Sequence, residues 1–150
     1  SSDAKQSPEY LLLQHSGASN HWSPPKGRQA KGEDEKRTAL RELAEESGIK
    51  KVRLLNFKHP EKYTFALKGK TFDKTATFFL GEVKNQKITL SKEHINYSWK
   101  TIEEAIKKLG NESAKLTYNK AHIFLSKNTD QRKKEKIILA SYPNCGRTWV

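Results

Sequence analysis

The segment Glu33–Ser47 constrains the fold of this chain more than any other, because it predicts a helix with two unlike faces. It contains neither glycine nor proline, good helix formers dominate it, and Gly48 stands where a helix commonly ends. Ala39, Leu40 and Leu43 lie close together on one side of such a helix. This side is apolar and predicts packing against a core.

The opposite side of the predicted helix is acidic. Glu42, Glu45 and Glu46 follow at i, i+3 and i+4, so their side chains share one face. Carboxylates at this density repel one another unless something positive lies among them. Mg²⁺ prefers oxygen ligands and is commonly shared between protein carboxylates and substrate phosphates. We therefore expect a divalent metal on this face, with Arg41 pairing to a neighbouring glutamate.

Composition limits the class of protein. A chain of 150 residues fits one domain, and no apolar run approaches the ~20 residues that span a membrane. The single cysteine, Cys145, excludes an internal disulfide and suits a reducing compartment, the cytoplasm or the nucleus. The net charge of +12 favours polyanionic partners, either a phosphate-rich small molecule or RNA on a basic surface. We expect a monomer with no membrane contact.

The remaining pattern predicts a mixed α+β fold. Strand-like segments rich in apolar, aromatic and β-branched residues occur at Glu9–Gln14, Lys51–Phe57, Lys62–Leu67, Thr75–Val83, Tyr97–Lys100 and Ile137–Asn144. Lys68–Lys70 predicts a turn. Two further helices are expected, over Thr101–Gly110, where Thr101 is the cap, and over Ser113–Asn128. The stretch between His15 and Gly27 is dense in glycine, serine and proline and predicts a loop.

The acidic helix resembles a known family motif. Gly27, five residues, Glu33, seven residues and then "RELAEESGI" reproduce every fixed position of the Nudix box. The resemblance implies a Nudix fold, an α/β/α sandwich with a mixed β-sheet between helices. It also implies hydrolysis of a nucleoside diphosphate linked to another group, with Mg²⁺ or Mn²⁺ as cofactor.

The resemblance assigns roles to the residues of the box. Glu45 and Glu46 are implied as metal ligands, and Glu42 as either a third ligand or the general base, two alternatives that stay open. These three form the implied catalytic set. The backbone carbonyl of Gly27 is implied to approach the metal, and Glu33 to brace the loop or a nearby water.

Two stretches outside the box narrow the resemblance. "NHWSPPKG", ending at Gly27, resembles "HHWTPPKG" of the animal-type asymmetrical diadenosine tetraphosphate hydrolases, and "LSKEHINYSW" over Leu90–Trp99 resembles "LSHEHQ..RW" of the same group. The likeness covers Glu9 to Leu125. It implies cleavage of diadenosine tetraphosphate to ATP and AMP.

The same group implies contacts beyond the metal site. Lys26 and Lys74 would contact phosphates, His21 would lie beside the polyphosphate chain, and Tyr63 would stack on an adenine. Glu93 would add a carboxylate to the metal site from a loop opposite the helix.

The chain also departs from this group. Arg28 replaces a histidine after "PPKG", which keeps a positive group for phosphate. Asn111 falls near the position of the second aromatic residue of the adenine clamp. The family begins with a strand before "EYLLLQ", whereas only eight polar residues precede that stretch here, so the first strand is expected to be missing.

The segment "IILASYPNCGRTWV" raises a separate question. It resembles the opening strand and phosphate-binding loop of sulfotransferases, with Asn144 and Arg147 as departures. One interpretation is a Nudix domain over residues 1–127 followed, over residues 128–150, by a charged linker and the truncated start of a sulfotransferase domain. The other is that this strand replaces the missing first strand of the Nudix sheet, or is a tail. Neither predicts sulfotransferase activity.

Two alternatives to diadenosine tetraphosphate hydrolysis remain at this stage. A Nudix hydrolase could act on another polyanion: a diphosphoinositol polyphosphate, capped RNA or a nucleotide sugar. A non-catalytic Nudix module could bind nucleotides or RNA without turnover, although such a module has no need for three metal-facing carboxylates.

Overall fold

The computed structural model describes residues 8–17, 20–84, 87–127 and 135–142. The elements, in chain order, are β1 (Glu9–His15), β2 (Trp22–Ser23), β3 (Lys26–Arg28), α1 (Glu35–Ser47), β4 (Arg53–Leu67), β5 (Lys70–Glu82), β6 (His94–Lys100), α2 (Ile102–Lys108), α3 (Glu112–Ser126) and β7 (Glu135–Tyr142). Within these described ranges, no helix is long and apolar enough to cross a bilayer.

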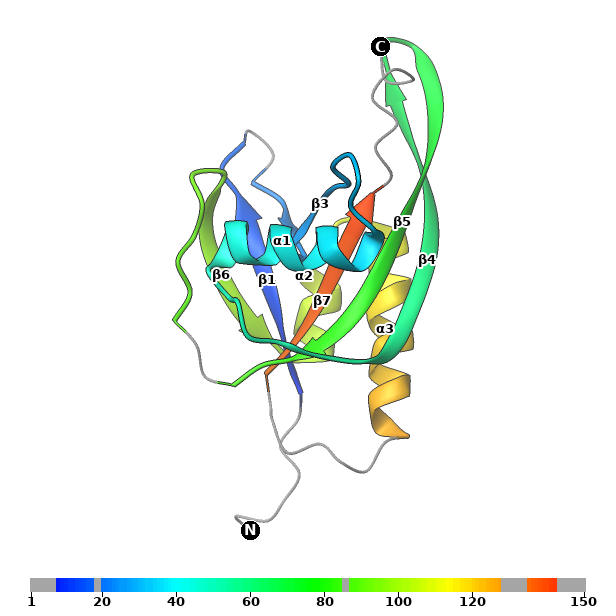
Figure 1. The fold of residues 1–150 in the computed structure, drawn as a ribbon. Helices are drawn as coiled ribbons and strands as arrows, with labels where there is room; N and C mark the ends of the chain where they lie inside the picture. Colours follow the sequence, from blue (N-terminus) through cyan, green and yellow to red (C-terminus); the bar gives the residue numbers. More distant parts are fainter. Residues whose placement is uncertain (1–7, 18–19, 85–86, 128–134, 143–150) are drawn as a thin grey trace.

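A single mixed sheet of seven strands lies between two layers of helix. Its main order is β2-β1-β7-β5-β4, while β6 pairs with β1 and β3 pairs with β7. Helix α1 covers one face and helices α2 and α3 cover the other (Figure 1). The structure thus confirms the expected α/β/α sandwich of the α+β class.

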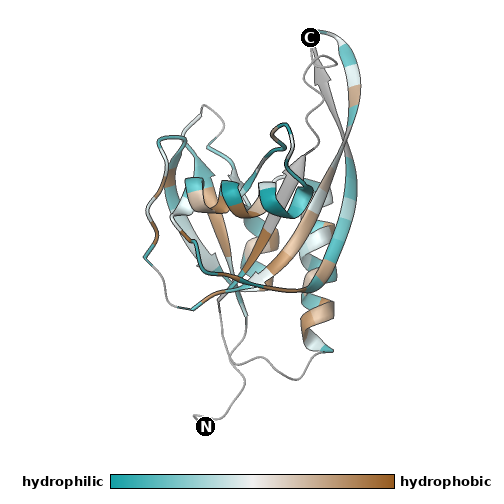
Figure 2. Ribbon diagram, viewed as in Figure 1, coloured by the Kyte–Doolittle hydropathy of each residue, from teal (hydrophilic) through white to brown (hydrophobic). Residues whose placement is uncertain are grey.

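Alternation along the central strands builds a core on each side of the sheet. In β1, Tyr10 and Leu12 belong to the cluster under α2 and α3, whereas Leu11 and Leu13 belong to the cluster under α1. Brown apolar segments lie along the central strands of the sheet, and α1 carries both teal and brown bands (Figure 2). Both faces of the sheet are therefore buried, which accounts for the uninterrupted apolar run in β1.

The predicted strands on either side of residue 60 are one strand in the structure. β4 runs from Arg53 to Leu67 and pairs with β5 as a long hairpin, with an irregularity of register between Leu54 and Lys58. The turn predicted at residues 68–70 is confirmed. Lys68 and Gly69 have φ of 52° and 76°, the left-handed conformation that a two-residue hairpin turn requires.

The helix ends follow their capping residues. α1 starts after Asp34, whose side chain accepts from the Arg37 N–H at 2.7 Å, and it ends at Gly48 with φ of 79°. Glu33 therefore precedes the helix rather than forming its first turn. The predicted cap of α2 is confirmed, because the Thr101 N–H donates to the Glu104 carboxylate at 3.3 Å.

The last described strand, β7, lies in the centre of the sheet. One of its edges pairs in parallel with β1 and then with β3, and the other pairs antiparallel with β5. Residues 135–142 therefore belong to the same sheet as the rest of the described fold. The division of the chain at residues 127 and 128, and the alternative role expected for this strand, stay predictions. The sulfotransferase-like loop after it lies outside the described residues.

Candidate active site

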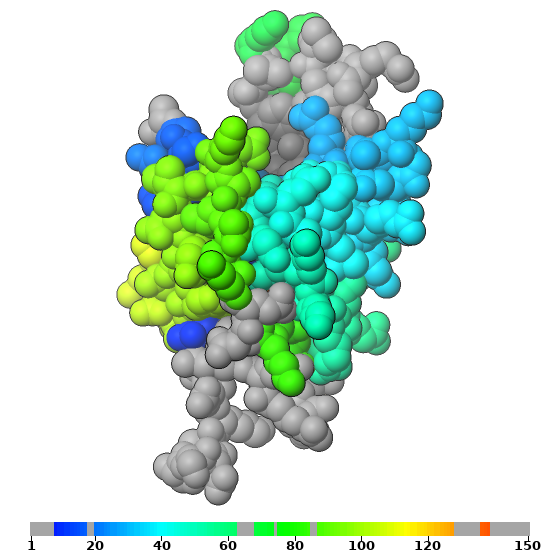
Figure 3. Space-filling view, turned by 60° about the vertical axis from the view of Figure 1, so that its left-hand side comes forward, coloured from blue at the N-terminus to red at the C-terminus, as the bar shows by residue number. Residues whose placement is uncertain are grey.

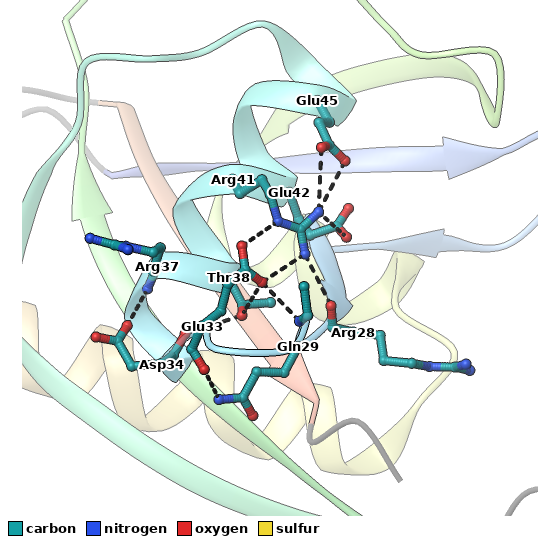
Figure 4. Close-up of polar contacts among 10 residues, drawn as sticks. Arg28, Gln29, Glu33, Asp34, Arg37, Thr38, Arg41, Glu42 and Glu45 are labelled. Carbon is teal, nitrogen blue, oxygen red and sulfur yellow. Dashed lines mark hydrogen bonds and ion pairs between the residues drawn. The ribbon is translucent and has the colours of Figure 1, made fainter. Parts of the chain in front are cut away.

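Arg41 organises the polar side of α1. Its guanidinium pairs with Glu33 at 2.6 Å, with Glu42 at 3.1 Å and with Glu45 at 3.3 Å. It also donates to the backbone carbonyl of Arg28 at 3.1 Å, so one side chain joins three carboxylates to the strand β3 (Figure 4). The expected pairing of Arg41 with a neighbouring glutamate is present in the structure.

Glu33 ties the loop before α1 to the helix. Its carboxylate accepts from the Ala30 N–H and from the Thr38 hydroxyl, both at 2.9 Å, in addition to Arg41. The hydrogen bond from Arg41, followed by that from Ala30, lowers the pKa of Glu33 to about 2. Glu33 is therefore ionised at neutral pH, and it holds the loop from Gly27 to Asp34 against α1.

Glu46 is the buried carboxylate of the helix, and Glu42 is partly buried beside it. Glu46 is 7% exposed, accepts from the Lys26 N–H at 3.2 Å and shares a hydrogen bond with Glu42. Burial, with the Glu42 charge next to it and Glu93 beyond, raises the pKa of Glu46 to about 8. Burial also raises the pKa of Glu42. Both carboxyls thus favour the protonated form more than a free glutamate does, and a cation bound between them would relieve their repulsion.

Glu93 reaches these carboxylates because its loop is bonded to the end of α1. The Thr89 N–H donates to the Ser47 carbonyl at 2.8 Å, and the Ser91 N–H to the Glu46 carbonyl at 3.3 Å. The segment leading into β6 lies directly beside α1 on the surface (Figure 3). The two segments are more than 40 residues apart in the sequence, and backbone hydrogen bonds bring them together.

A cavity of about 560 Å³ opens where β1, β3, α1 and the Glu93 loop meet. Hereafter it is called the carboxylate cavity. Its lining combines three carboxylates with basic and small residues: His15, Ser16, Gly17, Lys26, Gly27, Arg28, Glu42, Glu46, Lys92 and Glu93. Six of the predicted site residues therefore lie around one space: Lys26, Gly27, Arg28, Glu42, Glu46 and Glu93.

The donors of the carboxylate cavity suit a hard divalent cation, which prefers oxygen ligands. A side chain at Gly27 would overlap the Glu42 carboxylate, so glycine is what lets this backbone approach the helix. As the side chains stand, no group of three or more His, Cys, Asp or Glu residues in the described part is close enough together to hold a metal ion. Glu45 does not line the cavity; it is 58% exposed and pairs with Arg41.

Three histidines form a stack beside the carboxylates. The rings of His15 and His21 lie 4.2 Å apart and nearly parallel, and His94 packs on His15 at 4.7 Å. Burial, then the neighbouring histidine charges and Lys26, lowers the pKa of His15 to about 4. The pKa values of His21 and His94 are also lowered, first by burial. All three are neutral at pH 7.

A second cavity, of about 380 Å³, lies on the α2–α3 side and is hereafter called the apolar pocket. It is lined by His21, Trp22, Ser23, Pro24, Lys26, Phe78, Leu109, Gly110, Asn111 and Ala114. The Lys108 ammonium lies 4.7 Å from the centre of the Trp22 ring. Lys26 lines both cavities, so the apolar pocket and the carboxylate cavity adjoin at this residue.

Tyr63 and Lys74 lie further out on the hairpin. Their backbones are direct partners in the β4–β5 ladder, while their side chains are outside the described part. Their predicted roles stay predictions. Sequence reasoning missed His15, Lys92 and Phe78, although a histidine two residues after the last buried residue of β1 marks the end of that strand.

Comparisons with known proteins agree with this geometry. The family model described as the NUDIX domain matches residues 2–120. The asymmetrical bis(5'-nucleosyl)-tetraphosphatase of Mus musculus is 40% identical over 122 residues, which are 78% of this chain and 80% of the mouse protein. The Caenorhabditis elegans protein of the same name is 41% identical over 101 residues, which are 66% of this chain and 72% of that protein.

Solved structures extend the likeness to three dimensions. The crystal structure of a C. elegans Ap4A hydrolase binary complex matches with a TM-score of 0.68 at 32% identity, over 81% of this chain and 95% of that one. The E. coli dihydroneopterin triphosphate pyrophosphohydrolase shares the fold, with a TM-score of 0.62 at 20% identity over 76% of this chain and 85% of that one. The chain belongs to the NUDIX domain family.

Proposed function

We propose that this protein is a metal-dependent Nudix hydrolase of nucleoside polyphosphates, and that it splits diadenosine tetraphosphate into ATP and AMP. The observation that carries the proposal is the meeting of the two cavities at Lys26. One is apolar and aromatic, as a nucleobase requires, and the other holds carboxylates and cations, as metal-bound phosphates require. The relatives named for this reaction support the same substrate.

The carboxylates take the roles that the Nudix box implies. Glu42, Glu45 and Glu46 would form the catalytic set, with Glu93 and the Gly27 carbonyl completing the ligands of Mg²⁺ or Mn²⁺. The ion supplies neutralisation of phosphate charge and activation of water. The burial of Glu46 and the partial burial of Glu42 support them as the inner carboxylates, whereas Glu45 would have to leave Arg41 to join them. Glu42 remains either a ligand or the general base.

Basic residues at the cavity edge would bind the phosphate chain. Lys26 and Arg28 line the carboxylate cavity, and His21 lies at the mouth of the apolar pocket. Neutral His21 could donate one hydrogen bond to a phosphate oxygen without a fixed charge. We extend the proposal to Lys74 as a further phosphate contact and to Tyr63 as an adenine-stacking residue.

The proposal also covers the compartment of the protein, its oligomeric state and its binding to RNA. The single cysteine suits the cytoplasm or the nucleus, and we propose that the chain acts as a monomer. Its net charge of +12 would also support weak binding to RNA.

Incubation with diadenosine tetraphosphate and Mg²⁺, followed by ion-exchange chromatography, tests the proposal. Equal amounts of ATP and AMP, lost on addition of EDTA, are expected. Two molecules of ADP would contradict asymmetric cleavage. Absence of any products from a folded protein would contradict this substrate, and diphosphoinositol polyphosphates, capped RNA and nucleotide sugars would then be assayed in turn.

The matched variant is Glu46→Gln, which keeps the size of the side chain and removes its charge. Loss of a ligand or base is expected to lower turnover by about 10²–10⁴-fold. Binding of the nucleotide, measured by calorimetry with Ca²⁺, should change much less. Turnover at the wild-type rate would rule out Glu46 as a member of the site.

A further inference from the structure

The central strand of the sheet comes from outside the part of the chain that matches the family. The NUDIX model covers residues 2–120, whereas β7 spans Glu135–Tyr142. The family-matched residues alone leave a space between β1 and β5, because neither strand pairs with the other. β7 occupies this space and is hydrogen-bonded along both edges. We call the space the strand slot.

The strand slot recognises its occupant by side chains as well as by backbone. Ile137 enters the core under α1 and Ile138 the core under α2 and α3, and both are fully buried. The Lys136 ammonium is also buried and lies 3.4 Å from the buried Glu82 carboxylate. A slot that requires an ammonium followed by two apolar residues on opposite faces is selective in sequence and in register.

β7 also holds part of the active site. Residues 140–142 pair in parallel with β3, opposite Lys26, Gly27 and Arg28 in turn. These three residues line the carboxylate cavity, and the Lys26 N–H is the donor to Glu46. Without a strand in the slot, β3 would lose its ladder, and the backbone that faces the carboxylates would lose its position.

We propose that the space between β1 and β5 is a strand-binding site, that residues 135–142 are an exchangeable occupant of it, and that occupancy positions β3 for activity. Residues 128–134 join the occupant to the rest of the described fold. A strand that is bound through the hydrogen bonds of a sheet edge can be replaced by an equivalent strand. This inference rests on the proposed function in one measurement alone, the turnover of the nucleotide.

The test uses the full chain with a protease-recognition sequence in the connection 128–134. The folded protein is cut there, and a fluorescent peptide of residues 135–142 is added in excess. The anisotropy of the peptide should rise slowly as it replaces the original fragment, and mass spectrometry of size-exclusion fractions should find that fragment released. A cut protein that keeps its fragment through repeated dilution against excess peptide would contradict exchange.

Two matched peptides test recognition in the slot. Ile138→Asp places a carboxylate in the core under α3, so no uptake is expected. Lys136→Met keeps the bulk but removes one of the two cations that pair with Glu82, the other being Arg53, so weaker uptake than with the native peptide is expected. Equal uptake of all three peptides would show that the slot does not select its strand.

Hydrogen–deuterium exchange then separates this inference from the proposed function. In protein from which the fragment has been removed, amides of β3 should lose protection, and turnover should fall by about 10²-fold through misplacement of the site. Added native peptide should restore both. Unchanged β3 protection after removal would overturn the positioning role. If the intact chain itself failed to hydrolyse the nucleotide, the exchange measurements would still decide the inference.

Discussion

At the scale of single residues, the site depends on what burial does to carboxyl groups. Glu33 and Glu46 are both glutamates of the Nudix box, yet their pKa values move in opposite directions. Glu33 accepts hydrogen bonds from Arg41, Ala30 and Thr38, which stabilise its charged form. Glu46 is buried beside another carboxyl, which favours its neutral form until a cation arrives. Glu33 therefore holds the loop against α1, whereas the ionised form of Glu46 is favoured only when a cation lies beside it.

The stability of the metal-free protein should fall as pH rises. Because the pKa of Glu46 is raised from 4.5 to about 8, the folded chain holds a proton that the unfolded chain has released, and the free energy of unfolding decreases across this range. Added Mg²⁺ requires ionised ligands, so its stabilising effect should grow with pH. Thermal melts between about pH 5 and 8, with and without Mg²⁺, measure both trends. Both pH dependences should become weaker in Glu46→Gln. If they stayed the same in that variant, another titrating group would be their cause.

The substitution Gly27→Ala should damage the site without removing any functional group. Its Cβ would overlap the Glu42 carboxylate, so either that carboxylate or β3 must move. A displacement of about 1 Å at a catalytic site costs on the order of 10²-fold in turnover. Kinetics of Gly27→Ala beside Gly17→Ala, where a Cβ meets nothing within 4 Å, test this. Similar turnover in both variants would contradict the close approach at Gly27.

At the scale of elements, α1 presents its carboxylates because both of its ends are fixed. Asp34 caps its start, and the Gly48 conformation ends it, where the segment from Thr89 to Ser91 bonds to its last carbonyls. Its buried side includes Ala39 and Leu43. The helix is therefore held against the sheet in one rotation, with Glu42 and Glu46 toward β3.

The Asp34 cap should be measurable as stability. Asp34→Ala removes the acceptor of the Arg37 N–H on an exposed residue, and loss of such a cap costs about 1 kcal/mol. Urea denaturation followed by circular dichroism measures the change. Asp34→Ser, which can still cap, should recover most of the loss, and equal destabilisation by both substitutions would assign the effect to something other than the cap.

At the scale of the whole molecule, the chain is strongly basic, whereas its candidate site contains carboxylates. The chain carries a net charge of +12, yet three carboxylates line its candidate site. The general positive field attracts a polyphosphate, whereas the carboxylates select the metal-bound form of it. Lys26, Arg28 and Lys92 at the cavity bring the two together.

Hydrolysis should therefore depend on ionic strength mainly through substrate binding. Screening shortens the range of the positive field, so kcat/KM for the nucleotide should fall by about tenfold or more between low and physiological salt, with kcat nearly unchanged. Steady-state kinetics over a sodium chloride series measure this. Sucrose at matched viscosity should have little effect, and a fall carried by kcat alone would contradict electrostatic attraction.

Much of this protein is determined by local sequence. Helix α1, its apolar side and its end at Gly48 follow from residue spacing alone, as do the turn at Lys68 and Gly69 and the start of α2, because each depends on neighbours within four residues. Helix periodicity alone predicted that Glu42 and Glu46 share one face, whereas the approach of Gly27 to them was implied by the resemblance to the Nudix box. The break expected between residues 57 and 62 was wrong, because cross-strand pairing with β5 keeps β4 continuous.

Other features were decided only by tertiary structure. Sequence spacing could not assign Glu45 to Arg41 rather than to the cavity, because that choice depends on where the guanidinium is held by Glu33 and the Arg28 carbonyl. It could not place β7 in the centre of the sheet either. Strand order is set by which buried faces and hydrogen-bonding edges remain unfilled once the whole chain has folded, and those are non-local properties.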